Sequence, residues 1–228
     1  MKKYKKDSVL IIGDLHLPFE HKHYMDFCKG IQDKVRCGTV VQIGDLCDNH
    51  SLSFKWDSDP DGLSPLDEIK ATRKKVKLWE KAFPQLFLCR GNHDRRADDH
   101  GKKVGIPSVC FKPFREIWEL PDKWVDDFQF EIDGVKYFHG SGYRGDTAHM
   151  KAAQNSRQSC VIGHIHHLLE VGFTASEKDC IFGMCVGTGI DVKQYAFAYE
   201  RLFPRKPIVG CGVVTDHGKN AQVFRMEL

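Results

Sequence analysis

Imidazole side chains gather in one short stretch of the sequence, "VIGHIHHL" at residues 161–168. His164, His166 and His167 follow an apolar run that has the composition of a buried strand. Imidazole nitrogens bind transition metals and exchange protons near neutral pH. A lone histidine at a strand end is usually structural, so this cluster predicts a functional site only if the chain supplies partners for it.

Four further segments supply such partners, because each is a short apolar run that ends in glycine beside a side chain able to bind metal. They are "VLIIGDLH" (9–16), "TVVQIGDLCD" (39–48), "LFLCRGNHD" (86–94) and "VKYFHG" (135–140). Oxygen and imidazole donors without a thiolate suit a borderline divalent ion such as Mn, Fe, Zn or Ni. Side chains alternate along a strand with a period of two, so Asp-x-His and His-x-His on extended segments place both side chains on one side.

The elements that must position these side chains follow from the same runs, which we interpret as buried strands. Helical stretches at 22–35, 66–83 and 146–157 lie between them. Strands alternating with helices predict an α/β fold with largely parallel pairing, in which ligand-binding groups collect beyond the carboxyl ends of the strands. In the second half of the chain, two hairpins are expected, one turning at Asp133-Gly134 and one near Gly218-Lys219.

Length and composition set further bounds on the protein. The 228 residues fit one domain, and a net charge of +3 does not indicate a nucleic-acid-binding protein, although a local basic patch stays open. The nine cysteines include no CxxC pair, which is typical of buried thiols in a reducing compartment. The apolar run from Val9 to Ile12 is too short for a signal peptide, and no run reaches membrane-spanning length. We therefore expect a cytoplasmic protein without a membrane partner.

The motifs "GDLH", "GDLCD", "GNHD", "FHG" and "GHIH" resemble, in the same order, the motif set of the calcineurin-like metallophosphoesterases, over residues 13–166. The resemblance implies a four-layer α/β/β/α sandwich of two mixed sheets flanked by helices, formed by a single domain over residues 1–228. It also implies a dinuclear metal centre, with Mn²⁺ expected and Fe, Zn or Ni as alternatives. Carried over by position, Asp14, His16 and His166 hold one ion. Asn92, His139 and His164 hold the other ion, and Asp45 bridges the two.

The resemblance further implies hydrolysis of phosphate esters by in-line attack of a hydroxide that bridges the two ions. His93 corresponds to the family's catalytic histidine, which acts as the general acid, and Asp48 to its acidic partner. We expect Asn92 to contact the substrate as well, and Arg144 in "HGSGYRGD" to add positive charge near it. His167 is expected to point away from the ions, since a third ligand there would break the strand alternation.

Departures from the family pattern reduce the number of activities that we expect. The phosphoprotein phosphatases of this family carry Asp-Arg-Gly after the bridging aspartate, where this chain has "DNHS" (48–51), and a glycine where it has Leu17. The chain is more similar to small bacterial and phage members, which would place it in a host cytoplasm if a phage encodes it. The leading expectation is a phosphodiesterase that also accepts monoesters, with a small molecule or nucleotide as its partner.

Three alternatives to this reading stay open. They are a DNA nuclease of the double-strand-break-repair type, a phosphoprotein phosphatase, and a non-catalytic scaffold. The scaffold is the least favoured, because every motif position is filled. The oligomeric state is not predicted. The loop-like segment 51–65, with Phe54 and Trp56, is interpreted as a surface loop, with a substrate wall as the alternative.

Overall fold

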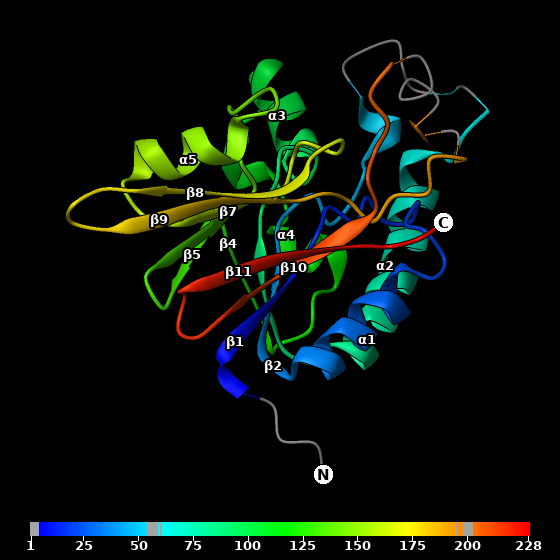
Figure 1. Ribbon diagram of the computed structural model, residues 1–228. Coiled ribbons are helices and arrows are strands. Elements are labelled where there is room, and N and C mark those ends of the chain that lie inside the picture. The colour runs from blue at the N-terminus through cyan, green and yellow to red at the C-terminus, as the bar shows by residue number, and fades with distance from the viewer. Residues whose placement is uncertain (1–4, 54–58, 60, 195, 198–202) are drawn as a thin grey trace.

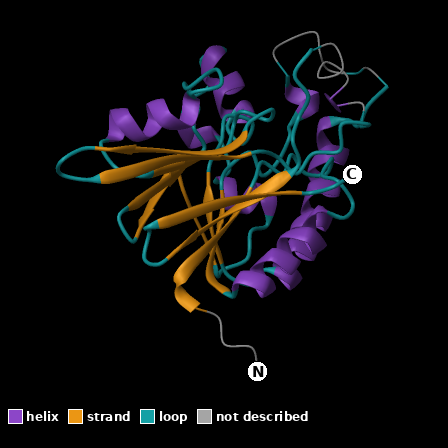
Figure 2. Cartoon of the chain, in the orientation of Figure 1, coloured by secondary structure: helices purple, strands orange, loops and turns teal. Residues whose placement is uncertain are grey.

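Two β-sheets pack face to face, and helices cover the outer face of each (Figure 1). The structure is a computed structural model that describes the chain except for residues 1–4, 54–58, 60, 195 and 198–202. Figure 2 shows the two layers of strands between α1 and α2 on one side and α5 on the other. The predicted four-layer α/β/β/α arrangement with two mixed sheets is confirmed.

The first sheet has the order β11-β10-β1-β2-β3-β4. The strands from β1 to β4 pair in parallel, and β10 and β11 are added antiparallel beside β1. The strand bounds are β1 (Lys5–Ile12), β2 (Cys37–Gln42), β3 (Leu86–Cys89), β4 (Trp124–Asp127), β10 (Gly210–Thr215) and β11 (Asn220–Arg225).

The second sheet has the order β5-β6-β7-β9-β8, with parallel pairing from β6 through β7 to β9 and antiparallel pairs at both edges. The predicted hairpin between β5 and β6 forms, and Asp133 and Gly134 take the positive φ values, 51° and 72°, that a tight hairpin turn needs. The predicted turn around Gly218 joins β10 to β11. The strand bounds are β5 (Gln129–Ile132), β6 (Val135–Phe138), β7 (Cys160–Ile162), β8 (Leu169–Ala175) and β9 (Cys180–Val186).

The three predicted helices form within two residues of their expected ends. α2 begins after Ser64, whose hydroxyl accepts a hydrogen bond from the Asp67 N–H at 3.3 Å, with Pro65 at the first helical position. Among the described residues, no helix is both long enough and apolar enough to span a bilayer. The helices and 3₁₀ turns are α1 (Tyr24–Val35), η1 (His50–Leu52), α2 (Pro65–Ala82), α3 (Arg96–Lys103), η2 (Ser108–Cys110), α4 (Phe114–Trp118) and α5 (Ala148–Ser156).

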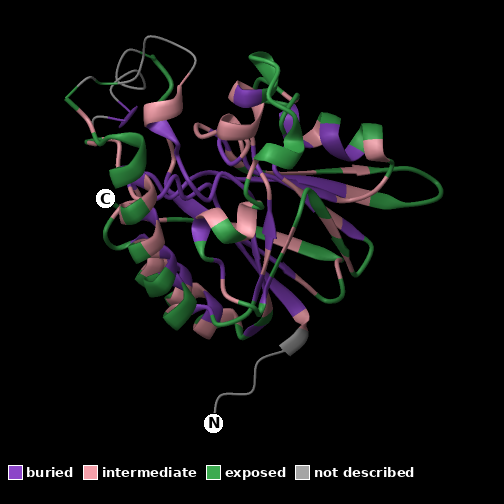
Figure 3. Ribbon diagram, turned by 180° about the vertical axis from the view of Figure 1, so that it is seen from behind, coloured by how far each residue is buried: buried purple, intermediate pink, exposed green. Residues whose placement is uncertain are grey.

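Strand β1 shows how the core divides between the layers. Val9 and Ile11 pack between the two sheets, whereas Leu10 and Ile12 face α1 and α2, so both sides of the strand are buried (Figure 3). This two-sided burial explains the continuous apolar run, since a strand with one wet face would alternate. All the cysteines are free, and all but Cys110 and Cys180 are buried, as expected for thiols that act as small apolar side chains.

Candidate metal centre

The loops after β1, β2, β3, β6 and β7 bring the predicted ligands together. Two groups, each with its ligand atoms within 4.8 Å of one another, correspond to the predicted ion sites: one is formed by Asp14, His16 and His166, and the other by Asp45, His139 and His164. The first sheet supplies the aspartates, and the second sheet supplies His139, His164 and His166. Residues that are distant in sequence therefore meet where the sequence predicts a metal centre.

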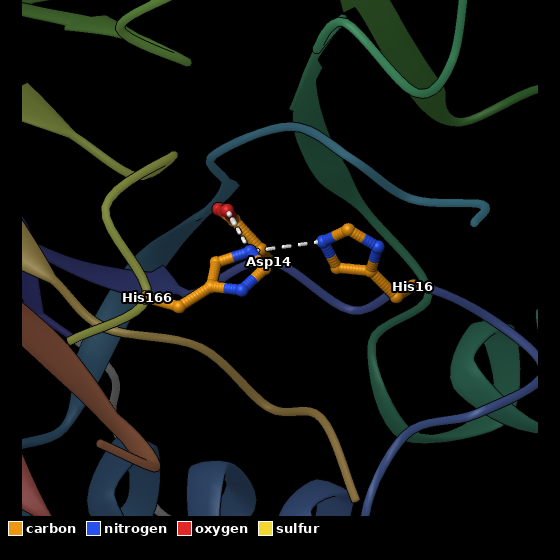
Figure 4. A group of neighbouring side chains, drawn as sticks. All are labelled: Asp14, His16 and His166. Atoms are coloured by element: carbon orange, nitrogen blue, oxygen red, sulfur yellow. Dashed lines mark hydrogen bonds and ion pairs between the residues drawn. The ribbon is translucent and has the colours of Figure 1, made fainter. Parts of the chain in front are cut away.

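In the first group, the imidazoles of His16 and His166 face each other beside the carboxylate of Asp14 (Figure 4). The two Nε2 atoms are 3.1 Å apart, and His166 Nε2 lies 3.4 Å from Asp14 Oδ2. The backbone of Asp14 is fixed because its carbonyl accepts hydrogen bonds from the Thr188 hydroxyl (3.0 Å) and the Gly189 N–H (2.8 Å). Asp14 Oδ1 is buried and has no hydrogen-bond partner among the described residues. Burial of such an oxygen is energetically unfavourable unless a cation approaches it.

In the second group, Asp45 and Asn92 both approach His139. His139 Nε2 lies 3.1 Å from Asp45 Oδ2 and 3.0 Å from Asn92 Oδ1, and the His164 ring stands edge-on with its centroid 5.0 Å away. Asp45 Oδ2 is also 3.7 Å from His16 Nε2 of the first group. Asp45 therefore lies between the groups, at the position where a bridging ligand is predicted.

The backbone at these ligands is not extended, whereas Asp-x-His and His-x-His were predicted to lie on extended segments. β1 ends at Ile12 and β7 ends at Ile162, so the Asp-x-His and His-x-His pairs lie in the loops beyond the strands. His16 and His164 have φ values of 49° and 66°, in the left-handed region that non-glycine residues rarely occupy. Strand alternation would place His164 and His166 on one side, whereas the turn of the loop at His164 places them in different donor groups.

Glycine precedes a ligand in these motifs because the backbone passes very close to a carboxylate. A Cβ atom on Gly163 would lie 2.2 Å from Asp14 Oδ1, and one on Gly91 would lie 2.0 Å from Asp45 Oδ1. Both carboxylates also accept hydrogen bonds from these loops, Asp14 from the His164 N–H at 2.9 Å and Asp45 from the His93 N–H at 2.8 Å. The tight approach locks the two aspartates in place.

His93 lies at the edge of this centre with both ring nitrogens engaged. Its Nδ1 is 2.8 Å from the Asp48 carbonyl oxygen and 3.1 Å from Asp48 Oδ1, and since a carbonyl can only accept, Nδ1 carries the proton. Its Nε2 accepts from Arg96 Nη2 at 3.0 Å. His93 also lies within 4.8 Å of donor atoms of His16 and Asp45, but these contacts occupy the lone pair that a metal would need.

Asp48 supports two histidines rather than one. Besides His93, it accepts a hydrogen bond from His16 Nδ1 at 2.6 Å, which leaves His16 Nε2 facing the first donor group. Burial alone would raise the pKa of Asp48, but the hydrogen bonds from His16 and His93 outweigh it and lower the pKa well below its usual range. The carboxylate therefore stays ionised while it orients both rings.

The electrostatics of the centre favour bound positive charge. Burial, reinforced by charged neighbours, lowers the pKa of His16 and lowers that of His164 to about 4, which keeps both imidazoles neutral and able to bind metal. Burial would also lower the pKa of His139, yet the carboxylates of Asp45 and Asp14 outweigh it and raise the pKa to about 9. Burial would raise the pKa of Asp45, and the imidazoles of His139 and His93 lower it well below its usual range instead.

Three neighbours of His93 were not predicted as site residues. Arg96 donates from Nη1 to the carbonyls of Asp48 (3.0 Å) and Asn49 (3.1 Å). The Asn49 side chain donates to the His93 carbonyl at 2.8 Å. Buried Asp94 accepts from the Gly91 and Cys47 N–H groups at 2.8 and 3.1 Å, and burial followed by the charge of Asp45 raises its pKa to about 6. The position of Arg96, one helical turn after His93, was the available signal for its contact.

A cavity of about 550 Å³ opens over the centre. Arg144 does not line it and is exposed on its loop, so the structure does not bring this predicted substrate residue to the ligands; Arg205, which was not predicted, lines the cavity instead. Phe54 and Trp56 lie outside the described residues. The cavity is lined by Asp45, Asn92, His93, His164, Ile165, His166, His167, Phe203, Pro204 and Arg205.

His167 lies on the cavity wall away from the donor groups. Its Nε2 is 3.4 Å from Asp146 Oδ1 and 3.3 Å from Arg205 Nη1, and it belongs to neither donor group among the described residues. The oxygen and nitrogen donors of the two groups, together with the Asp14 oxygen that has no hydrogen-bond partner among the described residues, fit a pair of divalent cations.

Comparison with known protein families gives a match over most of the chain. The profile of the calcineurin-like phosphoesterases matches residues 8–172. None of the curated proteins compared with the chain matches it. Among solved structures, an archaeal phosphodiesterase is 17% identical with a TM-score of 0.48, over 96% of this chain and 99% of that chain. The phosphoesterase Yfce from E. coli is 14% identical with a TM-score of 0.49, over 92% and 88% of the two chains.

A single mutant of Vps29 from Entamoeba histolytica is 12% identical with a TM-score of 0.45, over 96% of this chain and 99% of that chain. The family profile extends over most of the sequence and includes every predicted ligand, from Asp14 to His166. The chain belongs to the calcineurin-like phosphoesterase family.

Proposed function

We propose that the protein is a dinuclear metal-dependent phosphoesterase that hydrolyses phosphodiesters and also accepts monoesters. One observation carries the proposal: two donor groups meet at Asp45, and members of both groups line a single cavity together with His93. A phosphoryl group in that cavity would contact both cation sites and the proton donor at once. Membership of a phosphoesterase family supports the same reaction class.

The residues that would hold the ions are those of the two groups. Asp14, His16 and His166 would hold one ion, Asn92, His139 and His164 the other, with Asp45 shared between them. The mixed oxygen and imidazole donors suit Mn²⁺, and Fe, Zn and Ni are the alternatives. When bound, two such ions supply Lewis acidity toward the phosphoryl oxygens and activate water for in-line attack.

The protein's own groups would handle the leaving oxygen. His93, which lines the cavity, would protonate it from Nε2, because Asp48 engages the other ring nitrogen, Nδ1. Arg96 contacts that same Nε2 at 3.0 Å, so this contact has to open before Nε2 can carry the proton. The guanidinium would then lie one hydrogen bond from the departing oxygen and stabilise its charge. Asn92 would contact a phosphoryl oxygen in addition to an ion.

A protein phosphatase is a weaker proposal because of Asn49. This residue stands where those phosphatases carry a phosphate-binding arginine, and its side chain is used to hold the His93 carbonyl. The scaffold alternative is disfavoured because the donor atoms and His93 border one cavity. The nuclease alternative makes a separate prediction, since binding to DNA ends should weaken steeply as salt rises.

The test is a metal analysis combined with a substrate panel. The protein is loaded with Mn, Fe, Zn or Ni and assayed on bis(p-nitrophenyl) phosphate, p-nitrophenyl phosphate, cyclic nucleotides, DNA and a phosphopeptide. We expect two ions per chain, turnover of the diesters, and a loss of about 10²–10⁴-fold on natural esters in His93→Ala. His217→Ala, at an exposed histidine in the β10–β11 turn, is the matched control. Protein that binds two ions yet cleaves no ester would contradict the proposal.

A further inference from the structure

One wall of the cavity takes no part in holding ions or protons. It is formed by Phe203, Pro204 and Arg205, which lie close before β10 in the chain, and by Ile165 and His167 of the ligand loop. This wall combines an aromatic ring, apolar side chains and a guanidinium. Inorganic phosphate would need only the guanidinium, so the aromatic and apolar side chains of this wall point to the rest of the substrate.

The segment that carries Phe203 and Arg205 is tied to the metal centre. The Ile208 N–H donates to the His166 carbonyl at 2.8 Å, and the Thr188 N–H donates to the Ile208 carbonyl at 3.1 Å. Pro204 restricts the backbone of Phe203 to extended conformations. The Phe203 ring lines the same cavity as the predicted ligand His166, and 54% of the residue is exposed.

Arg205 is held at the mouth of the cavity but keeps donors available. Its Nη1 pairs with the Asp146 carboxylate and lies 3.3 Å from His167 Nε2. None of the described residues accepts a hydrogen bond from its Nε or Nη2. Both members of the Arg205–Asp146 pair are more than half exposed, and exposed ion pairs contribute little free energy, so a phosphate oxygen can compete for the guanidinium.

The size and charge of the cavity distinguish between small and polymeric substrates. A volume of about 550 Å³ is in the range of pockets that enclose a ligand of nucleotide size. A face that tracks a long nucleic acid would be lined by cations along the backbone path, whereas here Asp146 adjoins the arginine. A planar base can stack on Phe203 while the phosphate lies at the metal donors.

We propose that Phe203 and Arg205 form a recognition site for small nucleotide-type phosphodiesters, with the base stacked on Phe203 and a phosphate oxygen bound by Arg205. The inference rests on the proposed function, because it names the substrate class of the same cavity.

The experiment compares two esters that share one leaving group. Thymidine 5′-(p-nitrophenyl phosphate) carries a base, and methyl p-nitrophenyl phosphate does not. In the manganese-loaded protein, we expect Phe203→Ala to raise KM for the thymidine ester about tenfold, because stacking of one base on one aromatic ring contributes a free energy of that size. KM for the methyl ester should change by less than about twofold. Phe203→Trp should restore the preference. Phe173→Ala, at an exposed phenylalanine of β8 outside the cavity lining, is the matched control.

Arg205 gives a different expected pattern, because both esters carry the phosphate. Arg205→Ala should raise KM for both, by about tenfold for a lost charge-assisted contact, and Arg205→Lys should recover part of the loss. Equal KM values for the two esters in the wild-type protein, or a thymidine ester indifferent to Phe203→Ala, would overturn the proposal. A stronger preference for single-stranded DNA, with steep salt dependence, would overturn it as well.

A binding measurement separates this inference from the proposed hydrolysis. Calorimetric titration with thymidine 5′-monophosphate, with manganese and after chelation, reports recognition without turnover. If no ester is hydrolysed but the nucleotide binds the wild-type protein about tenfold more tightly than Phe203→Ala, the recognition site stands and the hydrolase proposal fails. If the two proteins bind the nucleotide equally, the recognition site fails whatever the activity.

Discussion

At the scale of single residues, Asp45 contacts both donor groups, since its Oδ2 lies 3.1 Å from His139 Nε2 and 3.7 Å from His16 Nε2. Asp45→Asn keeps an oxygen that can accept from the His93 N–H, so the loop should stay in place. The amide nitrogen cannot bind a cation, so we expect the variant to lose both ions. Asp14→Asn should lose one. Elemental analysis of dialysed protein, giving ions per chain, checks this.

The comparison of these two variants contains its own control, because each removes one carboxylate charge from the same buried centre. A general loss of negative charge would affect both alike. Two ions retained by Asp45→Asn, or none by Asp14→Asn, would contradict a shared carboxylate.

Arg96 is a positioning residue whose role depends on the leaving group. Its guanidinium, next to His93 Nε2, would stabilise charge on the departing oxygen, and this matters most for poor leaving groups such as alkoxides. We therefore expect Arg96→Ala to slow hydrolysis of alkyl esters by about 10–100-fold, and that of p-nitrophenyl esters by less than about threefold, because p-nitrophenolate departs unprotonated. Rates on a series of esters graded by leaving-group pKa test this.

Arg95→Ala is the matched control for Arg96, since the Arg95 guanidinium lies over the Phe128 ring, 5.9 Å from its centroid, rather than against His93. Arg96→Lys, which keeps the charge, should recover part of the alkyl-ester rate. If Arg96→Ala slowed all esters equally, Arg96 would be a structural support of the loops and not a partner of His93.

At the scale of elements, a strand or helix can be predicted from the sequence where its own residues show a clear apolar pattern. The strands β1 and β2 were predicted because both of their faces are buried, and a strand of this kind has a continuous apolar sequence. The residues of β8 are mostly half-buried or exposed, and α3 is strongly polar and contains Gly101, so neither shows the continuous apolar run of a fully buried element.

The same distinction applies to the site. The ligands follow buried strands within a few residues, so their motifs are local and were found. The contact between Arg205 and Asp146 spans 59 residues, and it depends on how the chain returns to the cavity before β10. Arg144 was predicted from its closeness in sequence to His139, but only the folded chain reveals that its side chain is exposed while Arg205 reaches the cavity.

Helix α2 fixes the loop that carries Asp48 through one buried carboxylate. Glu68 accepts from the His50 and Ser51 N–H groups at 2.8 and 3.0 Å and from the Ser51 hydroxyl at 2.7 Å. Glu68→Gln replaces one acceptor oxygen by an NH₂ group that faces donors. We expect a loss of about 1–3 kcal/mol in the free energy of unfolding, and a Tm lower by about 2–4 °C per kcal/mol. Thermal and urea unfolding measure both.

The control for Glu68 is Glu80→Gln, an exposed glutamate on the same helix, for which the free energy of unfolding should change by less than about 0.5 kcal/mol. Equal stability of the two variants would mean that the loop is held without Glu68. Since that loop also carries Asp48, Glu68→Gln should reduce turnover of alkyl esters as well.

At the scale of the whole molecule, the centre joins the two sheets. Asp14, Asp45 and Asn92 follow strands of the first sheet, and the ligating histidines 139, 164 and 166 follow strands of the second. In the interface between the sheets, apolar side chains such as those of Ile11 and Val161 belong to one hydrophobic core. Cations held by both sets of ligands would therefore cross-link the layers at one end of the molecule.

Metal removal should consequently lower the stability of the entire fold. A ligand that binds only the native state at 100 times its Kd contributes about 2.7 kcal/mol per site, which for a chain of this size is a Tm shift of about 5–10 °C. We expect chelation to lower Tm by at least that amount, and added Mn²⁺ to restore it in a concentration-dependent way. Asp45→Asn should melt at the same temperature with and without Mn²⁺, because its cation sites are lost. A wild-type Tm that is indifferent to chelation, in protein shown to carry ions, would mean that the cations do not link the sheets.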